Sequence, residues 1–218
     1  MITGIILAAG KSSRYQQNIP KQFSLFDNRM IIDYSIETFS NHNKIDDIII
    51  VVSKEYQKII QNKYPDFRVI RGGDRRQESS LNGLLGCNGK TKKVLIHDGA
   101  RAMLSPKIID NCLNALNKFD GVAPALPIIN TLANIDSNKK IIDIPNRKGY
   151  YELQTPQCFH YKVILDCFNK LNGKVTDDIS VLIQGGYKCT IVKGSKLNMK
   201  ITTQKDIKIL RELIWIIL

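Results

Sequence analysis

Residues 2–10 read ITGIILAAG, a run of branched apolar side chains that ends in three small residues. A strand that is buried on both faces has this nearly continuous apolar pattern, whereas a half-exposed strand alternates apolar with polar residues. We therefore predict a central strand of a parallel sheet here, followed directly by a loop.

Strands and helices alternate along the chain after this strand. Strands are predicted at residues 45–53, 67–73 and 92–100, and helices at 30–40, 55–64, 76–87 and 105–119, the last with Ser105 as N-cap before Pro106. Such alternation is typical of βαβ crossovers. The predicted fold class is α/β: a Rossmann-like three-layer fold with a mainly parallel central sheet.

The helical periodicity disappears after residue 120. Ser137-Asn138 lies between two extended runs, which predicts a protruding β-hairpin arm at about residues 127–150 that serves dimerisation. Helices follow at 161–171, 177–186 and 204–218, and strands at 189–194 and 199–203. We predict one domain over residues 1–218, because no repeat or low-complexity segment divides it.

Composition narrows the possible classes of protein. The 218 residues are 43% hydrophobic and carry a formal net charge of +12, which fits a globular protein that binds nucleic acid or polyanionic small substrates, or simply has a lysine-rich surface. The absence of any run of five basic residues argues against nucleic acid. Five cysteines without metal-ligand spacing indicate reduced thiols and a cytoplasmic location, and no apolar stretch approaches the roughly 20 residues of a membrane span.

The loop after the first strand has the composition of an anion-binding site. Ala8, Ala9 and Gly10 lack bulk, so backbone N–H groups can approach a ligand closely. Arg14 and Lys21 add positive charge, and Pro20 stiffens the backbone next to Lys21. Two fixed cations at a triphosphate stabilise the negative charge that develops when its α-phosphate is attacked. Small-residue turns without a ligand have the same pattern, so the loop alone does not decide.

Asp98 closes the predicted strand at residues 92–100. Open α/β sheets bind ligands at the carboxyl ends of their strands, and one carboxylate there suffices for Mg²⁺ when a nucleotide supplies the other ligands. An aspartate after a strand also forms turns or caps helices. A magnesium site at Asp98 is therefore one of two interpretations.

Several blocks resemble one enzyme family in their order along the chain. These are LAAGKSSRYQQNIPKQF at 7–23, GGDRRQES at 72–79, HDGAR at 97–101, TPQ at 155–157, TDD at 176–178 and NMKIT at 198–202. The set is similar to the 2-C-methyl-D-erythritol 4-phosphate cytidylyltransferases, a family of sugar-phosphate nucleotidyltransferases. The resemblance spans nearly the whole chain and implies transfer of CMP from CTP to a sugar-alcohol phosphate, with Mg²⁺ as cofactor.

The resemblance also implies a role for individual residues. Arg14, Lys21 and Lys200 would be catalytic, Asp98 would hold the metal, and CTP would contact Ala8, Ala9, Gly10, Lys11, Ser12, Gly73, Asp74 and Ser79. The acceptor phosphate would contact Arg101, Thr131, Arg147, Thr155 and Thr176, with Asp177 beside it. Thr131 and Arg147 match positions that reach into the neighbouring subunit, so the implied assembly is a homodimer. Nucleic acid and membranes are not expected partners.

Three positions depart from the family pattern. Ala102, Asn130 and Asn146 stand where the family usually has proline, aspartate and aspartate. These departures concern the acceptor more than CTP. Ribitol 5-phosphate cytidylyltransferase shares nearly all of the blocks and is an alternative, although the start LAAG, rather than LAGG, is more similar to the methylerythritol family. A non-catalytic basic nucleotide- or RNA-binding module is the alternative from another class.

Overall fold

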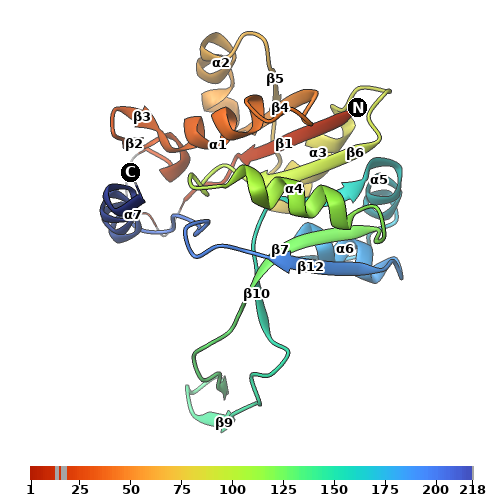
Figure 1. The fold of residues 1–218 in the computed structure, drawn as a ribbon. Coiled ribbons are helices and arrows are strands. Elements are labelled where there is room, and N and C mark those ends of the chain that lie inside the picture. The colour runs from red at the N-terminus through yellow and green to blue at the C-terminus, as the bar shows by residue number, and fades with distance from the viewer. Residues whose placement is uncertain (13–14, 16–18, 218) are drawn as a thin grey trace.

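The computed structural model describes residues 1–12, 15 and 19–217, with side chains of the last helix up to residue 213. Figure 1 shows a body of strands and helices from which one long arm projects. An eight-stranded sheet runs through the body. Seven of its strands follow the order β10-β7-β11-β6-β1-β4-β5, and the eighth, β12, also pairs with β7. Its strands are β1 (Ile2–Ala8), β4 (Asp47–Val52), β5 (Arg68–Arg71), β6 (Lys93–Asp98), β7 (Gly121–Pro127), β10 (Tyr151–Leu153), β11 (Gln157–His160) and β12 (Cys189–Lys193).

The sheet is mainly parallel. The pairs β1–β4, β1–β6, β4–β5 and β7–β12 are parallel. β11 is antiparallel to both β6 and β7, and β10 is antiparallel to β7. The predicted α/β fold class is thereby confirmed.

Helices cover both faces of the sheet. They are α1 (Ile31–Ser40), α2 (Lys54–Lys63), α3 (Arg76–Leu85), α4 (Pro106–Ala115), α5 (Tyr161–Asn169), α6 (Asp178–Gln184) and α7 (Gln204–Ile217). Alternate side chains of β1 point to opposite faces: Ile6 joins the core under α1 and α4, and Ile5 joins the core under α3, α5 and α6. Both isoleucines are fully buried, so the continuous apolar pattern of this strand reflects burial on two sides.

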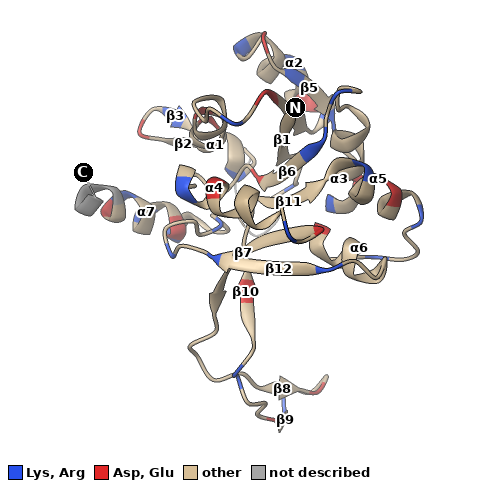
Figure 2. Cartoon of the chain, turned by 45° about the vertical axis from the view of Figure 1, so that its right-hand side comes forward, with Lys and Arg blue, Asp and Glu red and all other residues tan. Residues whose placement is uncertain are grey.

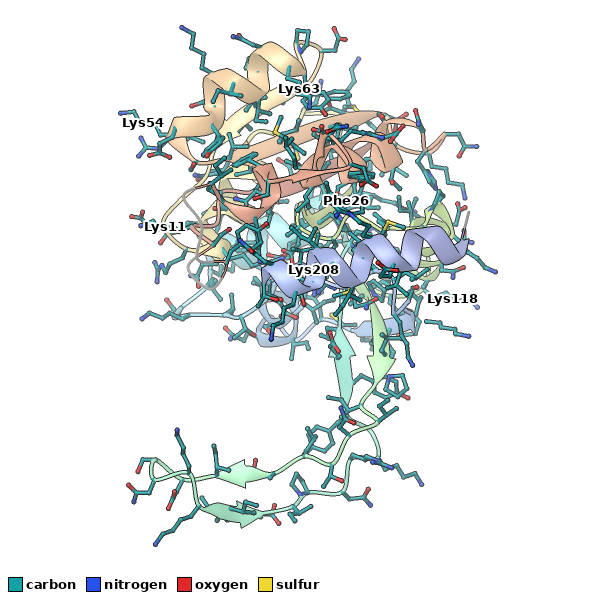
Figure 3. The ribbon with its side chains drawn as sticks, turned by 90° about the vertical axis from the view of Figure 1, so that its left-hand side faces the viewer. Lys11, Phe26, Lys54, Lys63, Lys118 and Lys208 are labelled. Carbon is teal, nitrogen blue, oxygen red and sulfur yellow. The ribbon has the colours of Figure 1, made fainter. Side chains whose placement is uncertain are left out.

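The helices begin and pack as their residues allow. Ser105 caps α4, its hydroxyl accepting a hydrogen bond from the Lys107 backbone N–H, as predicted. Gly4 lets α1 approach β1 closely, because a Cβ at this position would lie 2.3 Å from the Phe39 ring. α7 packs against the body through Leu210, which shares a cluster with the buried Phe26. Figure 3 labels Phe26 just above α7, on which Lys208 is labelled.

The predicted hairpin arm is present. It follows β7 and carries the short pair β8 (Asn134–Ile135) and β9 (Ile141–Asp143). Asp136 closes the turn, since its Oδ1 accepts hydrogen bonds from the backbone N–H groups of Asn138 and Lys140. Figures 1 and 3 show the arm standing away from the body.

The prediction of a strand at residues 199–203 is wrong, since this segment pairs with no strand of the sheet. The Ile201 N–H donates to the Ala100 carbonyl. The N–H groups of Thr202 and Thr203 instead donate to Asp206 Oδ2, at 2.7 and 2.8 Å. An acidic side chain at the start of α7 thus takes the donors that a strand would need.

Short elements were not expected from the sequence. β10 and β11, which follow the arm and precede α5 along the chain, are both strands of the sheet. A further pair, β2 (Leu25–Phe26) and β3 (Arg29–Met30), and a 3₁₀ turn, η2 (Lys21–Phe23), follow the first loop. None of the helices in the described part of the chain combines the length and apolar character needed to cross a bilayer.

Candidate active site

A cavity of about 240 Å³ opens at the carboxyl ends of β1 and β6. These are neighbouring parallel strands in the middle of the sheet, where α/β folds commonly bind ligands. Ten of the residues proposed from the sequence line it: Ala8, Ala9, Gly10, Ser12, Lys21, Gly73, Asp74, Ser79, Asp98 and Lys200. Segments that lie almost 200 residues apart in sequence therefore meet at one place.

A buried glutamine holds the loop after β1 in shape. Gln22 Nε2 donates hydrogen bonds to the carbonyls of Ala8, at 2.7 Å, and Gly10, at 2.9 Å. Its Oε1 accepts one from the Ser12 hydroxyl at 3.0 Å. Ser12 has a left-handed backbone with φ of 55°. Both ends of the loop are thus tied to one side chain, and the small residues between them face the cavity.

Lys21 lies at the start of η2 and lines the same cavity. Its backbone N–H donates to the Ser12 hydroxyl at 3.2 Å, which links it to the loop. Pro20 precedes it with φ of −57°. Arg14, the other cation predicted for this loop, lies outside the described residues.

The opposite wall comes from the turn after β5. Gly73 N–H donates to Ser79 Oγ at 3.2 Å, so the turn is tied to α3. Gly72 allows the turn to approach the first loop, because a Cβ there would lie 2.4 Å from the Ala9 Cβ. Lys11 and Asp74 are at the rim, with Nζ and Oδ1 4.0 Å apart and both side chains more than 80% exposed. An ion pair this exposed contributes little to stability.

Asp98 is the electrostatic centre of the site. Its carboxylate is buried, with Arg76 Nε 3.2 Å from Oδ1 and Lys200 Nζ 2.8 Å from Oδ2. Arg101 Nε lies 3.7 Å from Oδ2. Burial alone would raise the pKa of Asp98, but Arg76, Lys200 and Arg101 outweigh it and hold that pKa far below its usual range. The group is therefore a carboxylate at any physiological pH.

Arg101 and Thr155 contact Asp98 but do not line the cavity. Arg101 is 6% exposed and donates to the Asn198 carbonyl at 2.7 Å. Thr155 Oγ1 accepts a hydrogen bond from the Asp98 backbone N–H at 3.0 Å and lies 3.1 Å from Nδ1 of the buried His97. Burial lowers the pKa of His97 to about 4, so the imidazole is neutral near pH 7.

The remaining predicted acceptor residues do not line this cavity within the chain. Thr176 is exposed beside Asp177, whose carboxylate caps α6 by accepting from Ser180 N–H at 3.0 Å. Thr131 and Arg147 lie on the exposed arm, where the Arg147 guanidinium donates to the Ile129 carbonyl. The structure therefore brings the predicted nucleotide residues together and leaves the predicted arm residues apart from them.

Three residues of the site were not predicted. Arg76 pairs with Asp98 and also with the buried Asp178, and Gln22 organises the loop. All three stand inside sequence blocks that had been singled out, at residues 7–23, 72–79 and 176–178. Their residue types were visible, but their contacts depend on segments distant in sequence.

The donor set at Asp98 suits a metal that arrives with its own ligands. No group of three or more His, Cys, Asp or Glu side chains converges anywhere in the described ranges. Mg²⁺ commonly binds through one or two carboxylates together with phosphates and waters. A single ionised carboxylate at the cavity edge fits that pattern.

Comparisons of the sequence with known proteins all indicate the same family. The sequence model of 2-C-methyl-D-erythritol 4-phosphate cytidylyltransferase matches residues 2–214. The chain is 37% identical over 212 residues to the 2-C-methyl-D-erythritol 4-phosphate cytidylyltransferase of Clostridium botulinum (strain 657 / Type Ba4), covering 93% of each. Identity to the enzyme of the same name from Thermosipho melanesiensis is 38% over 217 residues, covering 95% of each.

The fold comparison gives the same answer. The crystal structure of 4-diphosphocytidyl-2C-methyl-D-erythritol synthase from Anaerococcus prevotii DSM 20548 superposes with a TM-score of 0.86 at 30% identity, covering 98% of both chains. Sequence, fold and the order of the sequence blocks thus indicate the same family. The chain therefore belongs to the 2-C-methyl-D-erythritol 4-phosphate cytidylyltransferase family, whose activity is CTP-dependent cytidylyl transfer in isoprenoid biosynthesis.

Proposed function

We propose that this chain transfers CMP from CTP to 2-C-methyl-D-erythritol 4-phosphate and releases pyrophosphate. The observation that carries the proposal is the convergence of Lys21, Lys200 and Asp98 in one cavity beside the small-residue loop. Family membership supports the reaction, and the cavity supplies the charges that this reaction needs. The five free cysteines support the proposed cytoplasmic location.

CTP would bind with its base and ribose against Ala8, Ala9, Gly73, Asp74 and Ser79. Gly10, Lys11 and Ser12 would then lie along the triphosphate, with Lys21 directed at the α-phosphate. Asp98 would hold Mg²⁺, which would supply positive charge to neutralise the triphosphate. The chain's own contribution is to orient these groups before the acceptor arrives.

The chemical step needs no nucleophile from the protein. A phosphate oxygen of the acceptor attacks the α-phosphorus in line, a new P–O bond forms, and the bond to the β-phosphate oxygen breaks as pyrophosphate leaves with its electron pair. The attacking oxygen is already anionic, so no general base is required. Arg14, Lys21 and Lys200 stabilise the charge on the equatorial oxygens in the transition state.

The acceptor site is proposed to be completed by a second copy of the chain. Arg101, Thr155 and Thr176 belong to the body, whereas Thr131 and Arg147 lie on the exposed arm. The arm also exposes Ile135, Ile141 and Ile142, each more than half accessible, which a partner's surface would cover. A homodimer that exchanges arms supplies both sets of residues to one site.

Replacing Arg147 with alanine is expected to raise KM for the acceptor about tenfold or more, with little change in KM for CTP. A lost charge-assisted contact to a phosphate accounts for this size of effect. Steady-state kinetics with each substrate varied in turn measures it. Equal effects on both KM values would contradict the assignment of Arg147 to the acceptor.

The proposed reaction is tested by pyrophosphate release. The protein is incubated with CTP, Mg²⁺ and either 2-C-methyl-D-erythritol 4-phosphate or ribitol 5-phosphate, and pyrophosphate is measured over time. We expect release with the first acceptor and at least a hundredfold lower kcat/KM with the second, because a site built to bind one set of hydroxyl groups rejects another. Greater turnover of ribitol 5-phosphate would refute the acceptor.

A nucleic-acid-binding module makes a different prediction. Figure 2 shows lysine and arginine spread over the helices, loops and arm of the described chain. Such a spread is typical of a solvated surface, whereas nucleic-acid binders concentrate positive charge on one face. Release of pyrophosphate in the same assay would exclude this alternative.

A further inference from the structure

An acidic side chain is buried behind the cavity wall. Asp178, the first residue of α6, is 1% exposed. Taking a carboxylate out of water costs several kcal/mol. The N-terminus of a helix returns about 1 kcal/mol of that. Burial accordingly raises the pKa of Asp178, and a positive partner is needed to keep its carboxylate charged.

Asp178 has one ionic partner among the described residues, and it is Arg76. Arg76 Nη1 lies 2.8 Å from Asp178 Oδ2, and Arg76 Nε lies 3.2 Å from Asp98 Oδ1. The guanidinium is planar and rigid, so two carboxylates at two of its edges fix both its position and its orientation. Arg76 also lines the cavity, with its side chain 26% exposed.

Lys200 is held differently. Its Nζ lies 2.8 Å from Asp98 Oδ2, its side chain is 36% exposed, and no second carboxylate lies within ion-pair range in the described chain. An ammonium held at one point on a flexible stem moves more readily than a guanidinium held at two. When the phosphates of CTP enter, Lys200 is the cation that is able to leave Asp98 for them.

We infer that Asp178 is a positioning residue, which anchors Arg76 so that it contacts Asp98 through Oδ1 and stays away from Oδ2. Lys200 and the more distant Arg101, at 3.7 Å, are the described cations near Oδ2, and once Lys200 has moved this oxygen is accessible to the divalent cation that accompanies CTP. Without the anchor, the guanidinium is able to rotate and pair with both Asp98 oxygens, the bidentate geometry that arginine and carboxylate prefer. It would then compete with the cation. This inference rests on the proposed function, because it takes Mg²⁺ with CTP as the ligand.

The test is the Mg²⁺ requirement of nucleotide binding in Asp178→Asn. Binding of α,β-methylene CTP, which cannot release pyrophosphate, is measured by calorimetric titration over a series of Mg²⁺ concentrations. We expect the half-saturating Mg²⁺ concentration to rise about tenfold, the usual effect of removing a residue that orients a metal ligand. The thermal midpoint Tm should fall, because the substitution removes one partner of a buried ion pair, so binding is measured well below the Tm of the variant. If the amide prevents folding, Asp178→Ser is measured in its place.

A double-mutant cycle separates positioning from a direct effect. In an Arg76→Gln background, Asp178→Asn should cause no further change in the Mg²⁺ requirement, because there is no guanidinium left to anchor. Asp33→Asn is the matched control: Asp33 is also a buried carboxylate, paired with Lys63 at 2.5 Å on α2, away from the cavity. It should lower Tm and leave the Mg²⁺ requirement unchanged.

Two results would overturn the inference alone. One is an unchanged Mg²⁺ requirement in folded Asp178→Asn, and the other is the same shift with and without Arg76. Failure of the unmodified chain to bind α,β-methylene CTP at any Mg²⁺ concentration would instead overturn the proposed function along with it. Binding, Tm and the cycle thus distinguish the two failures.

Discussion

Lys21→Ala is expected to lower kcat by about a hundred- to a thousandfold, the usual effect of removing one pre-positioned group that stabilises transition-state charge. Lys21 lines the cavity on the short turn after Pro20. CTP should still bind, since its proposed base and ribose contacts include Gly73, Asp74 and Ser79 on the opposite wall. Steady-state turnover together with titration of α,β-methylene CTP separates the two effects. We expect Arg14→Ala to behave in the same way.

Lys118→Ala is the control for charge alone. Lys118 is exposed and projects from the side of the body opposite Lys11 in Figure 3. Both substitutions remove one positive charge, so a general electrostatic effect on CTP would appear in both. Unchanged kcat in Lys21→Ala, or an equal loss in Lys118→Ala, would refute a specific role for Lys21.

Much of the sheet could be predicted because its central strands are locally distinctive. β1, β4 and β6 each contain an apolar run, and both faces of each are buried. β11 is only four residues long and lies antiparallel between β6 and β7. Its identity as a strand depends on those neighbours, so no local pattern could indicate it.

The segment at residues 199–203 is the opposite case, in which a strand was predicted and does not form. Its residues favour extended backbone, and Ile201 is indeed buried. Whether an extended segment becomes a strand depends on which partners are available for its N–H groups, and here Asp206 takes two of them. The resulting loop still delivers Lys200 to the cavity, so the functional prediction did not depend on the structural one.

In the site, too, local sequence patterns could be predicted, whereas contacts between distant segments could not. The blocks at residues 7–23, 72–79, 97–101 and 198–202 could be assigned to one site because each has a recognisable order of residues. The charge balance at Asp98 could not be assigned, because Arg76, Arg101 and Lys200 reach it from separate segments. Asp98 was predicted as an isolated carboxylate, and the structure surrounds it with three cations.

Those three cations make Asp98→Asn the substitution with the second large expected effect. The amide keeps the shape of the side chain and its backbone bond to Thr155. It removes the charge that pairs with Arg76 and Lys200 and that neutralises the buried Arg101. Removing one partner of a buried ion pair typically destabilises a protein by about 3 kcal/mol or more. We expect a lower urea midpoint.

Catalysis should fall further than stability in Asp98→Asn. The neutral amide is a poor ligand for Mg²⁺ and leaves Lys200 without a counter-charge, so kcat is expected to fall about a thousandfold in protein that is still folded. Asp110→Asn is the control, because Asp110 is a half-exposed carboxylate paired with Lys44 at 2.5 Å, and its replacement should change neither quantity appreciably. Urea unfolding and turnover at increasing Mg²⁺ measure the two effects separately. If Asp98→Asn kept its turnover with an unchanged Mg²⁺ dependence, the carboxylate would have no part in binding the metal, and its only task would be to neutralise the surrounding cations.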